Sequence, residues 1–293
     1  MPGDPRQEHP AGRGRGMRCG RPAAFGEAWV RRLRRCGVAR ASRIGGVAST
    51  VLLVALSLFC GGWVKGVFGM GLPTVSLGLL SLSMPPVEAA TLIVIPTLAT
   101  NAWQLMTGPS AVAVTARFSI LLVGVAIGTV LGVGFLTGSH TALVSLALGG
   151  VLILYAAVGL LSSRLHLPPR SERWMSPVIG VATGIVNGAT GVSVMPLVPY
   201  LTSLGLQREA LIQAMGLVFG IAMLSLAVCL TWTGHFKLAS AGASTLALLP
   251  VFAGMYTGQL VRVRLHAQAY RKWFFIGLIG LGAYSVIRSI GNL

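Results

Sequence analysis

Residues 62–90 read GWVKGVFGMGLPTVSLGLLSLSMPPVEAA, and residues 184–211 read GIVNGATGVSVMPLVPYLTSLGLQREAL. In both stretches glycines interrupt an apolar run, a proline follows closely, and a short loop leads into another apolar run. Aligning Lys65 with Asn187 also superimposes three pairs of glycines, namely Gly62 and Gly184, Gly66 and Gly188, and Gly69 and Gly191. A single match would be noise, but a collinear series indicates an internal duplication. The chain is therefore expected to consist of two related halves.

The composition is typical of a chain that lies in lipid. Of the 293 residues, 54% are hydrophobic and only 10% are Asp, Glu, Lys or Arg, whereas a soluble domain carries about 25% charged residues. Crossing the hydrocarbon core takes about 20 apolar residues. We predict an all-α, polytopic transmembrane helical bundle. Its ten hydrophobic segments lie near residues 47–66, 70–83, 87–107, 117–137, 140–162, 176–188, 190–206, 209–232, 238–260 and 272–290.

The number of crossings depends on what the glycine breaks do. If each break lies within one long tilted or broken crossing, about eight spans result, and this is the arrangement we expect. If every hydrophobic segment crosses, there are ten. The domain organisation that follows is a disordered basic tail at 1–46, a first transmembrane repeat at 47–162, a polar linker at 163–175 and a second repeat at 176–293.

The net charge of +17 does not indicate a nucleic-acid partner. The basic residues lie in the tail and between hydrophobic runs, where they orient the chain relative to the membrane, and no basic stripe is interleaved with aromatic residues. An enzyme is not expected either, since the sequence has no Asp beyond residue 45, no HExxH and no phosphate-binding GxxxxGK[ST]. The sequence predicts no metal and no cofactor, and its predicted partners are the lipid bilayer and a small anion.

Lys65 is the strongest single candidate for a substrate-binding residue. A cation at the bilayer centre costs at least about 2.5 kcal/mol on insertion scales, so it usually has a partner or a role. A helix broken at glycines leaves backbone N–H groups and a positive dipole end available to an anion. The candidate substrate-binding residues are Lys65, Gly66, Gly69, Gly71, Asn101, Gln104, Asn187, Gly188 and Gly191.

Each of these residues also has a simpler interpretation. Lysine at a helix end can extend its ammonium group to the membrane interface. Glycines let helix backbones approach closely in lipid, which is the better interpretation of Gly124, Gly128 and Gly132 on one helix face. Asn101 and Gln104, three residues apart, can line a path or bond to neighbouring helices.

At the two glycine breaks the sequence resembles the sulfite exporter TauE/SafE family, also called the toluene-sulfonate uptake permeases. That family has a duplicated unit in which an apolar helix and a glycine-rich turn precede a proline-containing run, a loop and an alanine-rich helix. The resemblance covers about residues 47–290. It departs from the family pattern where Met70 separates Gly69 from Gly71 and where Ser193 replaces a glycine.

This resemblance implies a secondary transporter in the cell membrane with seven or eight spans. It also implies that the substrate is sulfite, a sulfonate or a related sulfur-containing organic anion. Lys65 would then attract the anion, while backbone amides at the breaks and Asn187 would donate hydrogen bonds. The alternative is a membrane scaffold or partner subunit that transports nothing and whose glycines serve helix packing only.

Overall fold

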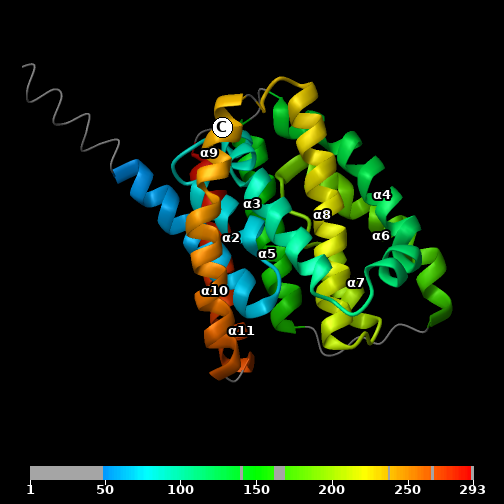
Figure 1. Ribbon diagram of the computed structural model, residues 1–293. Coiled ribbons are helices and arrows are strands. Elements are labelled where there is room, and N and C mark those ends of the chain that lie inside the picture. The colour runs from blue at the N-terminus through cyan, green and yellow to red at the C-terminus, as the bar shows by residue number, and fades with distance from the viewer. Residues whose placement is uncertain (1–48, 139–140, 162–168, 237, 265–266, 292–293) are drawn as a thin grey trace, which may run out of the picture. The chain divides into compact units, whose positions relative to one another are not determined.

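A computed structural model of the chain describes residues 49–138, 141–161, 169–236, 238–264 and 267–291, and within these ranges its regular secondary structure is entirely helical (Figure 1). The fold considered below is the unit Val51–Leu293. The predicted tail at 1–46 lies outside the described residues, whereas α6 already includes residues 169–175 of the predicted linker. The helices are a first helix at Ser49–Phe68, α2 Leu72–Leu80, α3 Pro86–Met106, α4 Ala111–Thr137, α5 Thr141–Leu161, α6 Pro169–Thr190, α7 Leu197–Ser203, α8 Arg208–Trp232, α9 Leu238–Leu246, α10 Leu248–Arg264 and α11 Ala267–Ile290.

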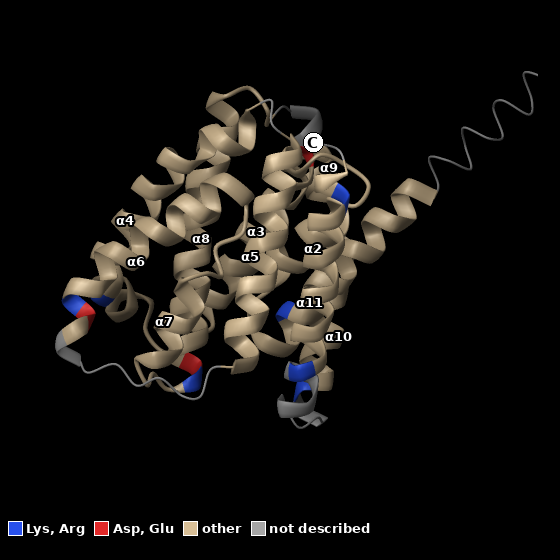
Figure 2. Cartoon of the chain, turned by 180° about the vertical axis from the view of Figure 1, so that it is seen from behind, with Lys and Arg blue, Asp and Glu red and all other residues tan. Residues whose placement is uncertain are grey.

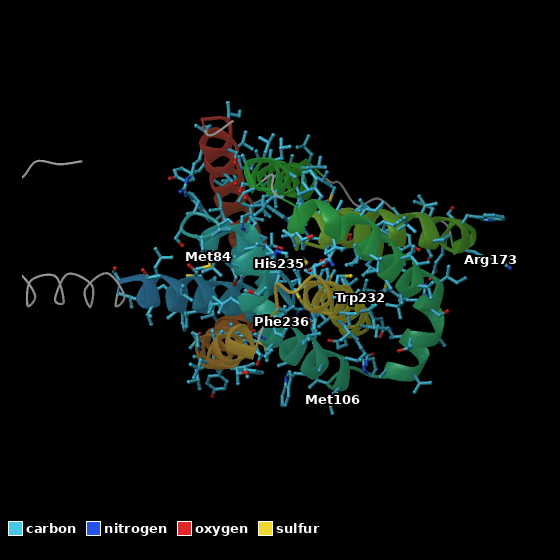
Figure 3. All side chains as sticks on the ribbon, turned by 90° about the horizontal axis from the view of Figure 1, so that it is seen from above. Met84, Met106, Arg173, Trp232, His235 and Phe236 are labelled. Atoms are coloured by element: carbon cyan, nitrogen blue, oxygen red, sulfur yellow. The ribbon has the colours of Figure 1, made fainter. Side chains whose placement is uncertain are left out.

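The predicted helical membrane bundle is confirmed. Among the described residues, seven helical segments are long and apolar enough to cross a bilayer. The 22 residues of α6 would span about 33 Å, which adds an eighth helix of membrane length whose first turn is charged. Large apolar side chains such as Leu131 and Ile287 are exposed, and the end-on view in Figure 3 shows side chains projecting outward around the bundle. Such an apolar exterior suits contact with lipid.

The two short helices α2 and α7 follow the glycine breaks. Gly69 and Gly71 have φ angles of 78° and 101°, and Gly191 has 75°, a left-handed conformation that residues with a Cβ rarely adopt. α2 then runs back along the first helix, since the Ser76 hydroxyl donates to the Ser57 carbonyl at 3.5 Å. The expectation that the first glycine break lies within a single tilted or broken crossing is therefore corrected, because the chain reverses there.

The two halves of the chain have the same order of helices, as the predicted duplication requires. In each half a long helix leads through a glycine break to a short helix, and three further helical segments follow, the second-half α9 and α10 together counting as one. The halves interlock, because α6, the first helix of the second half, packs on α4 of the first half. The first helix packs in the same way on α10. The two contacts are glycine seams, with Gly124, Gly128 and Gly132 facing Gly180, Gly184 and Gly188 in one, and Gly62 and Gly66 facing Gly254 and Gly258 in the other.

The halves have opposite orientations. Gln104 near the end of α3 bonds to Gly69 after the first helix, so these two helices run parallel. α4 begins where α3 ends, and Arg117 in its second turn forms a two-pronged ion pair with Glu172 at the start of α6. α6 therefore starts where the first helix ends and runs the other way. Inverted repeats of this kind are a common architecture of secondary transporters.

Charged residues lie mostly at the two ends of the bundle, with one basic position well inside it (Figure 2). The end where α4, α6, α8 and α11 begin carries most of the described basic residues, among them Arg117, Arg173, Arg208 and Lys272. At the opposite end, where α3 and α5 begin, the described basic residue is Arg288 in the last turn of α11.

Candidate functional site

A cavity of about 110 Å³ lies beside the first glycine break. The first helix, α3, α8 and α10 all contribute to its wall. The described residues that line it are Lys65, Gly66, Gly69, Thr100, Trp103, Gln104, Thr107, Ile212, Met255, Gln259 and Arg262. Because this set contains two basic side chains and no carboxylate, the wall is positively charged.

Lys65 is the innermost charge of this site. Lys65 is only 4% exposed, and its ammonium group donates a hydrogen bond to Oδ1 of the Asn101 side chain. In the described part of the chain no Asp or Glu is paired with it. A buried charge without a counter-ion has lost its hydration and regains little from a neutral amide. An anion in the cavity would supply the missing charge.

Asn101 and Gln104 are held by hydrogen bonds that determine which atoms remain free. Gln104 donates its amide N–H to the Gly69 carbonyl at 2.6 Å, which fixes the glycine turn and leaves Oε1, an acceptor, without a partner. Asn101 accepts from Lys65, so its free atom is the donor Nδ2. Asn101 thus keeps a donor free, whereas Gln104 holds the glycine turn.

These two side chains belong to a polar stripe on α3. Thr97, Asn101 and Gln104 are spaced by four and three residues, so they lie on one helix face. Each is buried, and each has one polar atom without a hydrogen-bond partner among the described residues. Leaving a buried polar atom unpaired costs about 1–3 kcal/mol, so such a cluster is unusual for a face that serves packing alone.

Asn187, the counterpart of Lys65, lies elsewhere. Its amide donates to the Ala222 carbonyl at 2.9 Å and to the Thr129 hydroxyl at 3.2 Å, and its free atom is the acceptor Oδ1. Both partners must accept here, because a carbonyl has no hydrogen to give and Thr129 donates its own to Val125. In this conformation Asn187 therefore offers no donor to an anion.

The predicted residues separate into three groups. Lys65, Gly66, Gly69 and Gln104 line the cavity, and Asn101 joins it through its bond to Lys65. Gly71 forms the reversal into α2, where a Cβ would lie 2.9 Å from Val64. The second-half residues Asn187, Gly188 and Gly191 do not line this cavity.

Two of the glycines also have clear packing roles. A Cβ on Gly66 would collide with the Met255 carbonyl of α10, and one on Gly188 would collide with the Thr129 carbonyl of α4. Gly191 faces Leu77 and Ala90, whereas Gly69 faces Ile212 and Gln104. The two glycine breaks therefore meet different helices.

Sequence reasoning did not assign Gln259 or Arg262 to the same site as Lys65. They lie three residues apart on α10, and they reach the cavity because the seam of Gly62 and Gly66 brings this helix against the first one. The spacing of Gly254 and Gly258 on α10 indicates a helix-packing face, but nothing in the sequence identifies the first helix as its partner. Glu209 at the start of α8 is the acidic residue that interacts with Arg262.

Comparison with known proteins agrees with this architecture. Residues 53–285 match the family described as Sulfite exporter TauE/SafE. Searches of curated proteins and of solved structures gave no match. The matched region covers well over half of the chain and contains both glycine breaks and every residue that lines the cavity. The chain is a multi-pass membrane protein of a transporter family, and it belongs to the sulfite exporter TauE/SafE family.

Proposed function

We propose that this protein is a secondary transporter in the cell membrane that carries a small sulfur oxyanion, with sulfite as the preferred substrate. The observation that carries the proposal is Lys65, a buried cation without a paired carboxylate among the described residues, at the wall of a cavity. Its charge attracts an anion, and the low local dielectric makes that attraction stronger than it would be in water.

The cavity size narrows the choice of substrate. The cavity volume of about 110 Å³ lies well below the roughly 300–1,000 Å³ of pockets that hold drug-sized ligands, so the space suits a small anion. An inorganic oxyanion or a one-carbon sulfonate fits this space, whereas an aromatic sulfonate requires the walls to move apart. We therefore expect discrimination by size within the class of sulfur-containing anions.

The side chains that line the cavity, together with Asn101 behind Lys65, have separate roles. Lys65 is the main charged contact, Asn101 Nδ2 donates a hydrogen bond, and Arg262 with Gln259 draws the anion in from the outer wall. Gln104 keeps the carbonyl of Gly69 away from the anion by donating to it at 2.6 Å. A scaffold whose glycines only pack helices would need none of these buried polar groups.

The test is anion flux into proteoliposomes that contain the purified full-length chain. Radiolabelled sulfite, sulfate, methanesulfonate and toluenesulfonate are compared at equal concentration. The proposal expects saturable flux of sulfite, slower flux of methanesulfonate and little of toluenesulfonate. If a well-folded, reconstituted protein moves none of these anions above the rate of empty vesicles, the proposal is wrong and the scaffold interpretation replaces it.

A further inference from the structure

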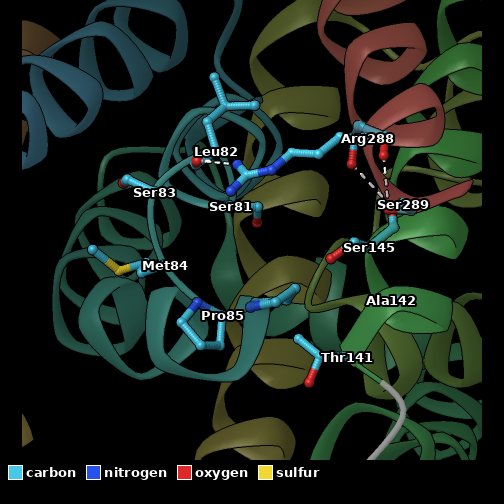
Figure 4. A pocket seen from close by; sticks show the side chains of 12 residues that line it. Ser81, Leu82, Ser83, Met84, Pro85, Thr141, Ala142, Ser145, Arg288 and Ser289 are labelled. Atoms are coloured by element: carbon cyan, nitrogen blue, oxygen red, sulfur yellow. Dashed lines mark hydrogen bonds between the residues drawn. The ribbon is translucent and has the colours of Figure 1, made fainter. Parts of the chain in front are cut away.

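A second and larger pocket lies at the end of the bundle where α3 and α5 begin. Its volume is about 420 Å³, and three segments that are distant in sequence form its wall: the loop between α2 and α3, the first turn of α5 and the last turns of α11 (Figure 4). The Lys65 cavity contains Gln104 and Thr107 at the end of α3, whereas this pocket contains Pro85 and Pro86 at its start. The two sites are therefore separated along the helix.

The wall of this pocket is rich in groups that can bind an oxyanion. Its described lining residues include one cation, Arg288, no carboxylate, and the six hydroxyl side chains of Ser81, Ser83, Thr141, Ser145, Ser285 and Ser289. Three of these hydroxyls donate to carbonyls, from Ser285 to Ser145, from Ser289 to Ser285 and from Ser83 to Leu80. The Ser81 hydroxyl is buried and has no hydrogen-bond partner in the part of the chain that the structure describes.

Arg288 lies across the pocket from α5. Figure 4 shows its side chain extending from α11 to the α2–α3 loop, where the guanidinium donates to the Leu82 carbonyl. This contact ties the loop to α11, which is a structural role in itself. A guanidinium has five N–H donors in a forked geometry that matches oxyanions, so one bond to a carbonyl leaves capacity for a ligand.

The helix ends around the pocket contribute partial charges of both signs, because the C-termini of α2 and α11, which also line it, carry partial negative charge. The N-terminus of α5 contributes Thr141, Ala142 and Ser145 to the lining, and a helix N-terminus carries a partial positive charge. The acidic residue nearest in sequence to the pocket is Glu88, in the first turn of α3. Its side chain is exposed and does not line the pocket.

We propose that this pocket, around Arg288 and Ser81, is a second oxyanion-binding site. Its ligand is a tetrahedral or pyramidal oxyanion, which is either the transported sulfur anion at the opposite face of the membrane or the phosphate of a lipid headgroup. The first identity rests on the proposed transport function. The second is independent of it.

The test is equilibrium binding of radiolabelled sulfite to the detergent-purified full chain, together with its content of lipid phosphorus. If the site holds the transported anion, the wild type binds two sulfite ions per chain. Arg288→Gln then weakens one site about tenfold, the amount expected for one charge-assisted hydrogen bond, and leaves the Lys65 site intact. Lys65→Met weakens the other site. The unchanged site in each variant shows that the chain is folded.

Two further variants separate binding from the structural role of Arg288. Ser81→Ala leaves the contact with Leu82 in place and is expected to weaken the same site, while Arg288→Lys retains only part of the affinity. Lys272→Gln, at the other end of α11, is the matched control and is expected to change neither site. If the ligand is a lipid phosphate, one sulfite site remains and bound phosphorus is lost in Arg288→Gln and Ser81→Ala. If these variants alter neither sulfite binding nor bound phosphorus, the inference is overturned.

Discussion

At the scale of single residues, Lys65 shows how burial turns a side chain into a functional group. A lysine that extends to the interface keeps its ammonium group in water, but here the residue is 4% exposed and its ammonium meets the Asn101 amide. Removing a charge from water costs several kcal/mol, and a neutral amide does not restore that energy. A transported anion would.

Replacing Lys65 with Met keeps the apolar stem and removes the charge. We expect insertion and folding to survive and the initial rate of sulfite flux to fall at least about tenfold, because a charge-assisted contact is lost. Lys65→Arg should retain part of the flux, since the guanidinium is broader and forked. Proteoliposomes with matched protein content provide the measurement, and Lys272→Met is the control. Undiminished flux by Lys65→Met would return Lys65 to a role at the membrane interface.

At the scale of helices, glycine seams determine which elements touch. On α4 a Cβ at Gly132 would collide with the Ile185 carbonyl of α6, whereas a Cβ at Gly134 would meet nothing within 4 Å. The two glycines lie on the same helix, two residues apart. Comparing the same substitution at both positions therefore distinguishes the effect of packing from that of helix propensity.

Gly132→Ala is expected to lower the free energy of unfolding by about 1–3 kcal/mol, because the seam must open to admit a methyl group. Gly134→Ala is expected to be neutral or to stabilise the protein by up to about 1 kcal/mol, because alanine is the better helix former. Thermal unfolding of both variants in the same detergent makes the comparison. Equal effects of the two substitutions would show that the α4–α6 seam is not close-packed.

A proline in α3 creates a second contact between elements. Pro96 has no N–H, so the Leu92 carbonyl lacks its helical donor. The Ser244 hydroxyl of α9 donates to that carbonyl at 2.7 Å and accepts from the Ile95 N–H at 3.0 Å. The buried Ser244 thus hydrogen-bonds to the backbone groups next to the proline and links α9 to α3.

Ser244→Ala leaves the Leu92 carbonyl without a donor and removes an acceptor of the Ile95 N–H, and it is expected to destabilise the protein by about 1–3 kcal/mol. The neighbouring Thr245 is exposed and donates only within its own helix, to Ala241. Thr245→Ala should therefore change stability by no more than about 0.5 kcal/mol. Unfolding temperatures of the two variants decide the matter, and a Ser244→Ala protein as stable as the wild type would contradict this role of Ser244.

At the scale of the whole molecule, the inverted repeats place the starts of α6 and α11 at one end and the end of α8 at the other. The described basic residues Arg117, Arg173, Arg208 and Lys272 lie at the first end, so the positive-inside rule predicts that this end is cytoplasmic. In that orientation the Lys65 cavity, whose wall includes Arg262, would face the cytoplasmic half of the membrane, and the pocket at Arg288 would face the other side.

This orientation is testable with single cysteines in a variant without native cysteines. A membrane-impermeant maleimide applied to intact cells should label Thr233→Cys, after α8, and should label Ser171→Cys and Ala267→Cys only after permeabilisation. The two protected positions should behave alike, because α6 and α11 begin at the same end. Labelling of Ser171→Cys and Ala267→Cys from opposite sides would instead support the eight-span arrangement with each break inside one crossing.

The sequence by itself determined the membrane environment, the helical class, the duplication and the identity of the first glycine break. These depend on composition, run length and backbone freedom, which are local properties of the chain. It also singled out Lys65, because a lysine within an apolar run is costly wherever that run ends up.

Only the tertiary structure decided what lies opposite Lys65. The reversal at Gly69 and Gly71, the pairing of the first helix with α10 and the arrival of Arg262 all depend on contacts between residues far apart in sequence. Each amide side chain has one donor group and one acceptor oxygen. Which of the two stays free on Asn101, Gln104 or Asn187 depends on the partner that hydrogen-bonds to the other. Spacing along a chain gives the candidates, but the neighbours that long-range packing brings to each side chain decide its chemistry.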